Sequence, residues 1–187
     1  MERLPRVVGT ERAFEGRIFG VRSDVVRFDD GRDVRLDIVE HAGSFAILAR
    51  PDPEHIVLVR QYRHPARAYL WELPAGKAEA GESPVDGAAR ELAEETGYRA
   101  GRLEELASFY MTPGFCEERL HLVLAEDLAP GEASPDGDEA IEVRIATLEE
   151  FFAMARDGEI VDAKTLLAAL WLAARAGERT HLLPGGG

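Results

Sequence analysis

The chain has 187 residues, 45% of them apolar, which suffices for one domain with a modest extension. Its formal net charge of −13 argues against electrostatic capture of nucleic acid or of an anionic membrane surface. Cys116 is the only cysteine, which rules out an internal disulfide, and no apolar run resembles a signal peptide or could span a bilayer, so we expect a cytoplasmic protein.

The first 40 residues are expected to form a β-rich extension. Arg17–Arg27 mixes β-branched, aromatic and charged residues, as strands at a sheet surface do. Asp29-Asp30-Gly31 then supplies a hairpin turn, because aspartate and glycine tolerate the backbone angles of tight turns. Val34–Val39 is the expected return strand.

The remaining elements follow from short apolar runs and their flanking turn residues. Two core strands are expected before the central helix, at Phe45–Leu48 and Ile56–Val59, and three after it, at Leu103–Tyr110, Arg119–Ala125 and Ile141–Ala146. Two further helices are expected, one over Leu148–Arg156 and one from about Asp162 to Gly177. Pro130–Asp138 is a polar loop of the kind that often carries function.

The central helix has clear sequence boundaries. Ser83 is suited to cap its N-terminus, with Pro84 at the first helical position and Asp86 three residues after the cap. Gly97 is placed to end it. At 100° per residue the apolar residues share one side, and the charged residues of the segment Arg90–Glu95 share the other.

The charged side of this helix raises a question, because three glutamates lie close together in its second half. Arg90 and Glu94 are spaced for a salt bridge, but Glu91 has no basic residue three or four positions away. Each like-charged pair costs about 0.2–0.5 kcal/mol unless it is compensated. A bound divalent metal would supply that compensation. The helix alone leaves open whether this side is a solvated surface or a metal site.

The spacing around the helix decides between the two. Gly76, Glu82, Arg90-Glu91, Glu94-Glu95 and Gly97 follow one another as in the box of the Nudix hydrolase family, which this segment resembles at every fixed position. Tyr98 is the one departure, since the family more often has an aliphatic residue there. The resemblance implies a Nudix α/β/α sandwich with a mixed sheet and an N-terminal β extension.

The resemblance also implies a metal site for two or more Mg²⁺ or Mn²⁺ ions. Its ligands would be the backbone carbonyl of Ala75 and the carboxylates of Glu91, Glu94 and Glu95, because these cations take oxygen ligands. Arg90 would orient a glutamate, and Glu82 would help to hold the loop that starts at Gly76. No pattern of histidine and cysteine suggests zinc.

Three flanking features resemble the ADP-ribose pyrophosphatase branch of the family. Gln61-Tyr62-Arg63 precedes the lead-in Trp71–Gly76, Pro113 lies sixteen residues after Gly97, and two stretches near the C-terminus, 138–143 and 158–165, are also similar. The likeness runs from about Val34 to Leu172. It implies hydrolysis of the diphosphate of ADP-ribose to AMP and ribose 5-phosphate.

Roles for individual residues follow from this branch. Arg63 is expected to bind a phosphate, the alternative being a surface ion pair. Glu139 is expected to be the general base, the alternative being a loop charge without a role. Glu118 would contribute loop or metal contacts, or pair with Arg119. Pro113 and Gly114 are expected to line the substrate site; Trp71 and Phe115 are candidates to stack on adenine, although aromatics are more often core residues.

The expected organisation has three parts. Residues 1–40 form an extension that crosses between the subunits of a homodimer, residues 41–180 form the hydrolase domain, and residues 181–187 form a flexible tail. Two alternatives stay open for the function. One is hydrolysis of another nucleotide-sugar, such as ADP-glucose or GDP-mannose, and the other is a sensor that binds ADP-ribose without cleaving it.

Overall fold

The computed structural model describes residues 4–134 and 140–175, and the chain divides into two compact units. The first unit contains Met1–Ser44 together with Ser108–Leu120. The second contains Phe45–Ala107 and His121–Gly187.

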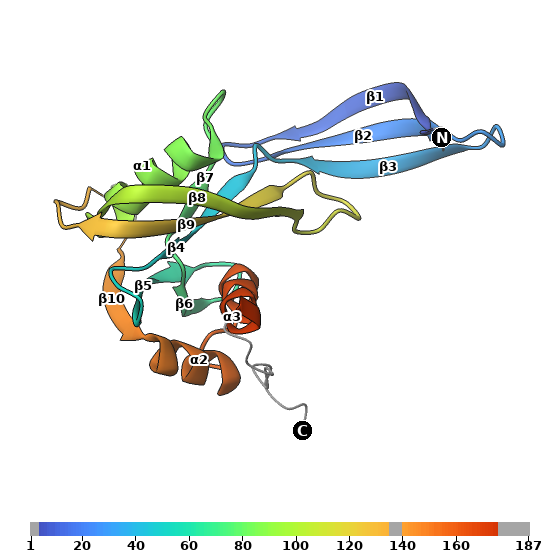
Figure 1. Cartoon of the computed structure of the whole chain (residues 1–187). Coiled ribbons are helices and arrows are strands. Elements are labelled where there is room, and N and C mark those ends of the chain that lie inside the picture. The colour runs from blue at the N-terminus through green and yellow to red at the C-terminus, as the bar shows by residue number, and fades with distance from the viewer. Residues whose placement is uncertain (1–3, 135–139, 176–187) are drawn as a thin grey trace. The chain divides into compact units, whose positions relative to one another are not determined.

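The first unit is built on a three-stranded antiparallel sheet in the order β1-β2-β3 (Figure 1). Its strands are β1 (Arg6–Glu15), β2 (Gly20–Arg27) and β3 (Asp33–Glu40). The hairpin predicted between the last two strands is confirmed: Gly31 has a φ of 84°, and its N–H donates to the carbonyl of Phe28 at 2.9 Å. The positive φ explains why glycine stands at this turn.

The segment from Ser108 to Leu120 belongs to this first unit because it pairs with β3. The N–H of Val39 donates to the carbonyl of Phe115 at 2.7 Å, and the N–H of Glu117 donates to the carbonyl of Val39 at 3.0 Å. Arg22 of β2 adds an ion pair at 2.5 Å to Glu117 of this segment. The loop that contains Pro113 is therefore held against the N-terminal sheet.

The second unit is built around two sheets. One has three strands in the order β10-β5-β6, formed by Glu142–Thr147, His55–Arg63 and Ala68–Glu72. The other has four strands in the order β7-β4-β9-β8, formed by Ala75–Lys77, Ser44–Ala49, Arg119–Ala129 and Arg99–Tyr110. All the strands predicted in this part of the chain are present, most of them extended by a few residues at one or both ends.

Helices cover both faces of the four-stranded sheet (Figure 1). Successive side chains of a strand point to opposite faces. Val123 and Ala125 of β9 pack in the core with Leu92 of α1 (Pro84–Thr96). Leu124 and Glu126 instead line a cavity with Trp171 of α3 (Ala163–Arg175). The α/β/α arrangement predicted from the sequence is confirmed.

The helix boundaries agree closely with the sequence. α1 and α2 (Leu148–Arg156) begin and end at the predicted residues. α3 begins one residue after its predicted cap, and its predicted end at Gly177 lies outside the described residues. Within the described ranges, the structure contains no helix that combines the length and the apolar character needed to cross a membrane.

Candidate active site

The central helix α1 is fixed in place at both ends and along its packed side. The N–H of Asp86 donates to Oγ of the cap residue Ser83 at 3.2 Å. Gly97 adopts the left-handed conformation with a φ of 76°, and its N–H donates to the carbonyl of Ala93 at 2.9 Å. Gly87 lies directly against Phe45, since a Cβ built there would be 2.0 Å from the ring. The helix therefore presents its glutamates in a defined orientation.

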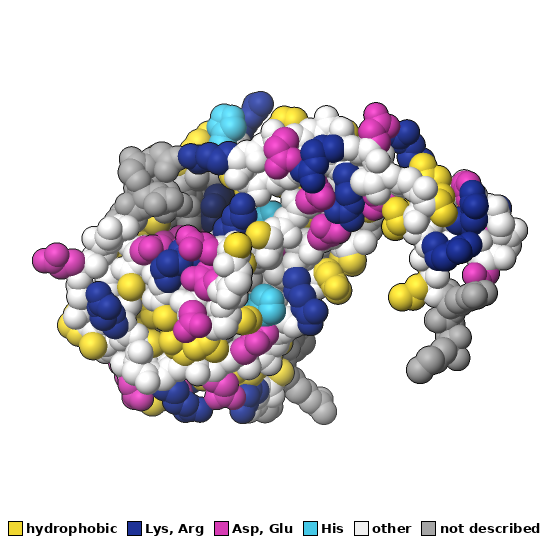
Figure 2. All heavy atoms as spheres, turned by 90° about the horizontal axis from the view of Figure 1, so that it is seen from above, with side chains coloured by type: hydrophobic (Ala, Val, Ile, Leu, Met, Phe, Trp, Pro, Cys, Tyr) yellow, Lys and Arg dark blue, Asp and Glu magenta, His cyan; other side chains and the backbone are white. Residues whose placement is uncertain are grey.

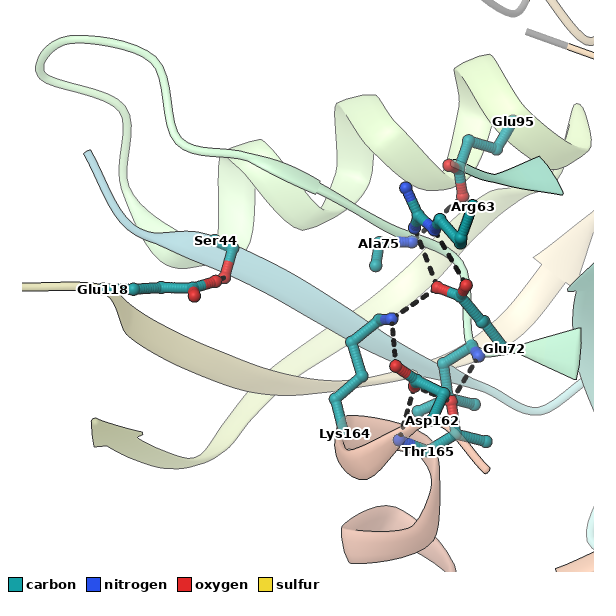
Figure 3. Close-up of polar contacts among 10 residues, drawn as sticks. Ser44, Arg63, Glu72, Ala75, Glu95, Glu118, Asp162, Lys164 and Thr165 are labelled. Carbon is teal, nitrogen blue, oxygen red and sulfur yellow. Dashed lines mark hydrogen bonds and ion pairs between the residues drawn. The ribbon is translucent and has the colours of Figure 1, made fainter. Parts of the chain in front are cut away.

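Glu95 is buried, with 4% of its surface exposed. The helical projection groups it with the charges on the solvent-accessible side, but the structure places the backbone of Ala75 over it. Ala75 begins the glycine loop (residues 75–83), whose first three residues form the short strand β7. The N–H of Ala75 donates to Oε2 of Glu95 at 3.0 Å (Figure 3). A carboxylate in such a position must be satisfied by hydrogen bonds or by a cation, because burial of an unpaired charge is costly.

Gly76 brings the backbone of the same loop against Glu91. A Cβ built on Gly76 would lie 1.8 Å from Cδ of Glu91 and within about 2 Å of both carboxylate oxygens. Only glycine leaves room for this approach. The predicted ligands Ala75, Glu91 and Glu95 are thus brought together by one helix and one loop.

Arg90 links three glutamates around the loop. Its Nε donates to Glu82 at 2.9 Å, and its Nη1 donates to Glu91 at 2.8 Å and to Glu94 at 2.9 Å. The hydrogen bond with Glu82 is the main reason why the pKa of Arg90 is raised and the pKa of Glu82 is lowered. Acidic and basic side chains lie side by side on the face shown in Figure 2, which carries α1.

This arrangement corrects one step of the sequence interpretation. We inferred that Glu91 has no basic partner, because residues three and four positions away are not basic. The adjacent Arg90 pairs with it instead. A long guanidinium side chain can fold along the helix surface to its neighbour once Glu82 holds its other edge. The predicted pair between Arg90 and Glu94 is confirmed.

Glu82 and Arg90 also hold the glycine loop. Oε2 of Glu82 accepts from the N–H of Glu79 at 3.1 Å, and Nη2 of Arg90 donates to the carbonyl of Lys77 at 3.2 Å. Arg90 of the helix therefore binds the loop at Lys77 and at Glu82, near its two ends, and Glu82 also closes the loop on itself through Glu79.

The polar loop after β9 meets the C-terminal end of α1. The N–H of Ser134 donates to the carbonyl of Glu94 at 2.9 Å, and the carbonyl of Gly131 lies 2.8 Å from the position that a Cβ on Gly97 would take. Glu139, the predicted general base, lies outside the described residues.

Arg63 is in a bidentate ion pair with Glu72 (Figure 3). Nε and Nη2 of Arg63 each donate to one carboxylate oxygen at 2.8 Å. Glu72 has 1% of its side chain exposed and Arg63 has 39%, so the pair joins a buried acid to a base that reaches the surface. That Arg63 binds a phosphate stays a prediction. The hydrogen bond with Glu72 is the main cause of the raised pKa of Arg63.

Lys164 and Asp162, at the start of α3, complete this network. Nζ of Lys164 donates to Glu72 at 2.5 Å and to Asp162 at 3.0 Å. Burial by itself would raise the pKa of Glu72, but Arg63 and Lys164 outweigh it, and the pKa is lowered. We assigned no role to Glu72 or Lys164 from the sequence. The available signals were a glutamate between the apolar residues Trp71 and Leu73, at the end of β6, and the presence of only two lysines in the chain.

The other predicted substrate residues lie in the first unit. Pro113 and Gly114 form a tight turn, in which the carbonyl of Thr112 accepts from the N–H of Phe115 at 3.2 Å and from that of Cys116 at 3.0 Å. Glu118 accepts a hydrogen bond at 2.7 Å from Oγ of Ser44 (Figure 3).

The two aromatic candidates differ in their surroundings. Trp71 is half-buried in β6, and the guanidinium groups of Arg60 and Arg144 lie 5.9 and 5.8 Å from its ring. Phe115 is 55% exposed. Trp71 is thus engaged by two cations of its own sheet, whereas Phe115 presents a free surface.

The residues of the central site fit a divalent cation that prefers oxygen ligands. Glu91 and Glu95, one helical turn apart, both have their carboxylates against the backbone of the Ala75–Gly76 loop. Such a donor set suits Mg²⁺ or Mn²⁺. Over residues 4–134 and 140–175, no three acidic, histidine or cysteine side chains stand grouped as a complete metal site. Backbone oxygen and water ligands would have to complete the coordination, as is usual for Mg²⁺.

The protein has an α/β/α fold in which the central helix α1 presents two carboxylates to the backbone of Ala75 and Gly76. The family model described as "NUDIX domain" matches residues 40–169. The chain therefore belongs to the Nudix hydrolase family.

Individual relatives cover nearly the whole chain. It is 38% identical, over 169 residues, to the protein named ADP-ribose pyrophosphatase from Bacillus subtilis (strain 168). The matched region covers 89% of this chain and 91% of that protein. It is equally similar, with the same coverage, to the methanol dehydrogenase activator of Bacillus methanolicus. A crystal structure of an ADP compounds hydrolase has the same fold, with a TM-score of 0.79 over 93% of this chain and 94% of that one, at 24% identity.

Proposed function

We propose that this protein hydrolyses the diphosphate of ADP-ribose to AMP and ribose 5-phosphate. The observation that carries the proposal is the convergence of Glu91 and Glu95 on the Ala75–Gly76 loop. The names of relatives such as the Bacillus subtilis ADP-ribose pyrophosphatase support the choice of substrate. Hydrolysis of another nucleotide-sugar on the same site is the nearest alternative.

The cofactor in this proposal is Mg²⁺ or Mn²⁺. Glu91, Glu95 and the carbonyl of Ala75 would hold it, and Glu94, whose side chain is 44% exposed, would contribute from the same helix. When bound, such ions neutralise a diphosphate and lower the pKa of a bound water. Arg90 keeps Glu91 and Glu94 in place through charged hydrogen bonds, which are stronger than neutral ones.

The chain's own residues account for the remaining steps. Arg63 would bind a phosphate oxygen with the guanidinium edge that does not contact Glu72. Glu139 would accept a proton from the water that attacks phosphorus, and the bond between phosphorus and the bridging oxygen would break. The backbone N–H of Ser134 donates a hydrogen bond to the carbonyl of Glu94, and Glu139 comes five residues later in the sequence. Five residues reach at most about 17 Å, which limits how far Glu139 can lie from α1. Glu139→Gln, assayed as below, would test this role by lowering kcat more than KM.

The reaction is tested with a panel of nucleoside diphosphate derivatives. Each is incubated with Mg²⁺, and phosphate is measured after the products have been treated with a phosphatase. We expect ADP-ribose to be cleaved fastest, and Glu95→Gln to lower turnover at least about 100-fold, because the buried carboxylate is lost. Glu79→Gln, a change at an exposed residue of the same loop, is the control and should retain full turnover.

Three outcomes would each overturn a part of this proposal. If ADP-glucose or GDP-mannose is cleaved faster than ADP-ribose, the substrate assignment fails while the hydrolase assignment stands. If no derivative is cleaved but ADP-ribose binds, the protein is a sensor. Glu95→Gln with normal turnover at saturating Mg²⁺ would overturn the metal site.

We also propose a homodimer in the cytoplasm, with residues 1–40 as the dimerisation element, residues 41–180 as the hydrolase domain and residues 181–187 as a tail. The exposed apolar side chains of β1, Val7 and Val8, which are 58% and 45% exposed, support an interface there. Sedimentation equilibrium should give twice the mass of one chain.

Pro113, Gly114 and Glu118 remain proposed substrate contacts.

A further inference from the structure

Glu72 is a buried carboxylate at the end of β6 and lies three residues before Ala75. Removal of a carboxylate from water is costly unless cations and hydrogen bonds replace the water. Arg63 and Lys164 both provide this compensation. Apolar residues would fill the same space at lower cost, which suggests that the charge has a purpose other than stability.

The contact between Arg63 and Glu72 fixes the plane of the guanidinium group. Nε and Nη2 both donate to the carboxylate, so the edge of the guanidinium group that carries them is occupied by Glu72. The edge that carries Nη1 is directed away from Glu72. The side chain of Arg63 remains 39% exposed. Arg63 lies between Glu72 and Glu95 in Figure 3, and Glu95 acts electrostatically on it. The accessible edge therefore belongs to the same region as the carboxylates of α1.

Glu72 and the backbone of the next residue, Leu73, are held by the first turn of α3. Lys164 donates to the carboxylate of Glu72, and Oγ1 of Thr165 accepts from the N–H of Leu73 at 2.9 Å (Figure 3). Asp162 accepts from the hydroxyl of Thr165 at 2.6 Å and from Lys164, which fixes both donors. Glu72 and Leu73 are thus anchored to α3, two to three residues before Ala75, whose N–H donates to Glu95.

We infer that Glu72 is a positioning residue of the hydrolytic site. It holds the Arg63 guanidinium in the orientation that receives a phosphate group of the substrate, and α3 holds Glu72 through Lys164 and the next residue, Leu73, through Thr165. This inference rests on the proposed function of the site. Glu72 touches no substrate in this scheme and acts only through Arg63.

The first test is Glu72→Gln, which retains the shape of the side chain and removes its charge. Arg63 loses a charged bidentate contact, so we expect KM for ADP-ribose to rise about 10–100-fold while kcat and the Mg²⁺ requirement change little. Glu142→Gln is the control, because Glu142 is an exposed glutamate on β10 of the same sheet, also paired with an arginine. It should leave KM unchanged. A KM that is unchanged in Glu72→Gln would overturn the inference.

The second test is a double-mutant cycle that separates positioning from a purely structural role. If Glu72 acts through Arg63, Glu72→Gln should raise KM in the wild-type background and have no further effect in an Arg63→Ala background. Effects that multiply would show an independent role and overturn the inference. If Glu72→Gln alone does not fold, because Arg63 and Lys164 lose their partner, the charge-balanced pair Glu72→Gln with Lys164→Met replaces it, with the same expected rise in KM.

The third test does not depend on turnover. In the wild-type protein the Nε–H of Arg63 is held by Glu72, so its NMR signal should be resolved and slow to exchange with water. In Glu72→Gln we expect faster exchange, and an unchanged exchange rate would overturn the inference. Failure of the proposed function gives a different result: the wild-type protein then cleaves no nucleoside diphosphate, whatever the state of Arg63.

Discussion

At the scale of single residues, the backbone at Gly76 lies so close to the carboxylate of Glu91 that a residue with a Cβ atom at position 76 would clash with it. The position has a role that burial alone does not reveal, because it is half-exposed and belongs to the short strand β7. The role of this glycine is to leave space for the carboxylate of another residue.

We predict that Gly76→Ala will lower kcat at least about 100-fold and leave the fold intact. The new methyl group would force Glu91 off the loop, and small displacements of catalytic groups have effects of this size. Turnover and circular dichroism are the measurements. Gly9→Ala is the control, because a Cβ there meets only ordinary contacts at 3.9 Å from Val25. Equal activities of the two variants would contradict the prediction.

At the scale of elements, the capping residues of α1 favour a helix, whereas Gly87 within it disfavours one. The cap at Ser83 and the left-handed Gly97 follow from residue type alone. Gly87, in the first half of the helix, lowers helix propensity by about 1 kcal/mol relative to alanine. Its contact with Phe45 explains why it is tolerated, since the helix could not lie this close to β4 with any side chain there.

We predict that Gly87→Ala will destabilise the protein by about 1–3 kcal/mol, as overpacking of a core does, although propensity favours the alanine. Urea unfolding measures the free-energy change. Ala93→Gly on the same helix reports the propensity effect separately and should cost about 1 kcal/mol. A Gly87→Ala variant that is more stable than the wild type would show that Phe45 can move away at little cost.

At the scale of the whole molecule, the net charge of −13 makes the pairing of buried acids a condition of stability. The pKa values of Glu72 and Glu82 are both lowered from the ordinary value of 4.5, for Glu72 against the effect of burial and for Glu82 mainly by Arg90. At pH values between the folded-state pKa of each glutamate and 4.5, the unfolded chain binds more protons than the folded one. These two groups therefore stabilise the folded state fully above pH 4.5.

We predict that the free energy of unfolding will fall as the pH is lowered from 4.5 through the lower folded-state pKa values of these glutamates. Urea titrations from neutral pH to about pH 3 measure this dependence. In Glu72→Gln the slope should be shallower, because one titrating group is removed. A slope in this window that is the same in both proteins would assign the acid sensitivity to other carboxylates.

The fold and part of the site could be predicted from the sequence because their signals are local or follow a fixed spacing. The hairpin at Gly31, the bounds of α1 and α2 and the glutamates of the box are of this kind. The partner of Glu91 was predicted wrongly, since regular helix spacing does not describe how far an arginine can reach along the surface.

By itself the sequence determined where the central helix α1 begins and ends and which carboxylates it carries, because caps and periodicity act within a few residues. Only the tertiary structure decided which carboxylates are buried and what holds them. Glu95 meets Ala75 across 20 residues, and Glu72 meets Lys164 across 92. Contacts at such separations depend on how the strands and helices pack, and residue type alone does not reveal them. Glu91 and Glu95 of α1 come together only because the backbone of Ala75 and Gly76 packs against both of them.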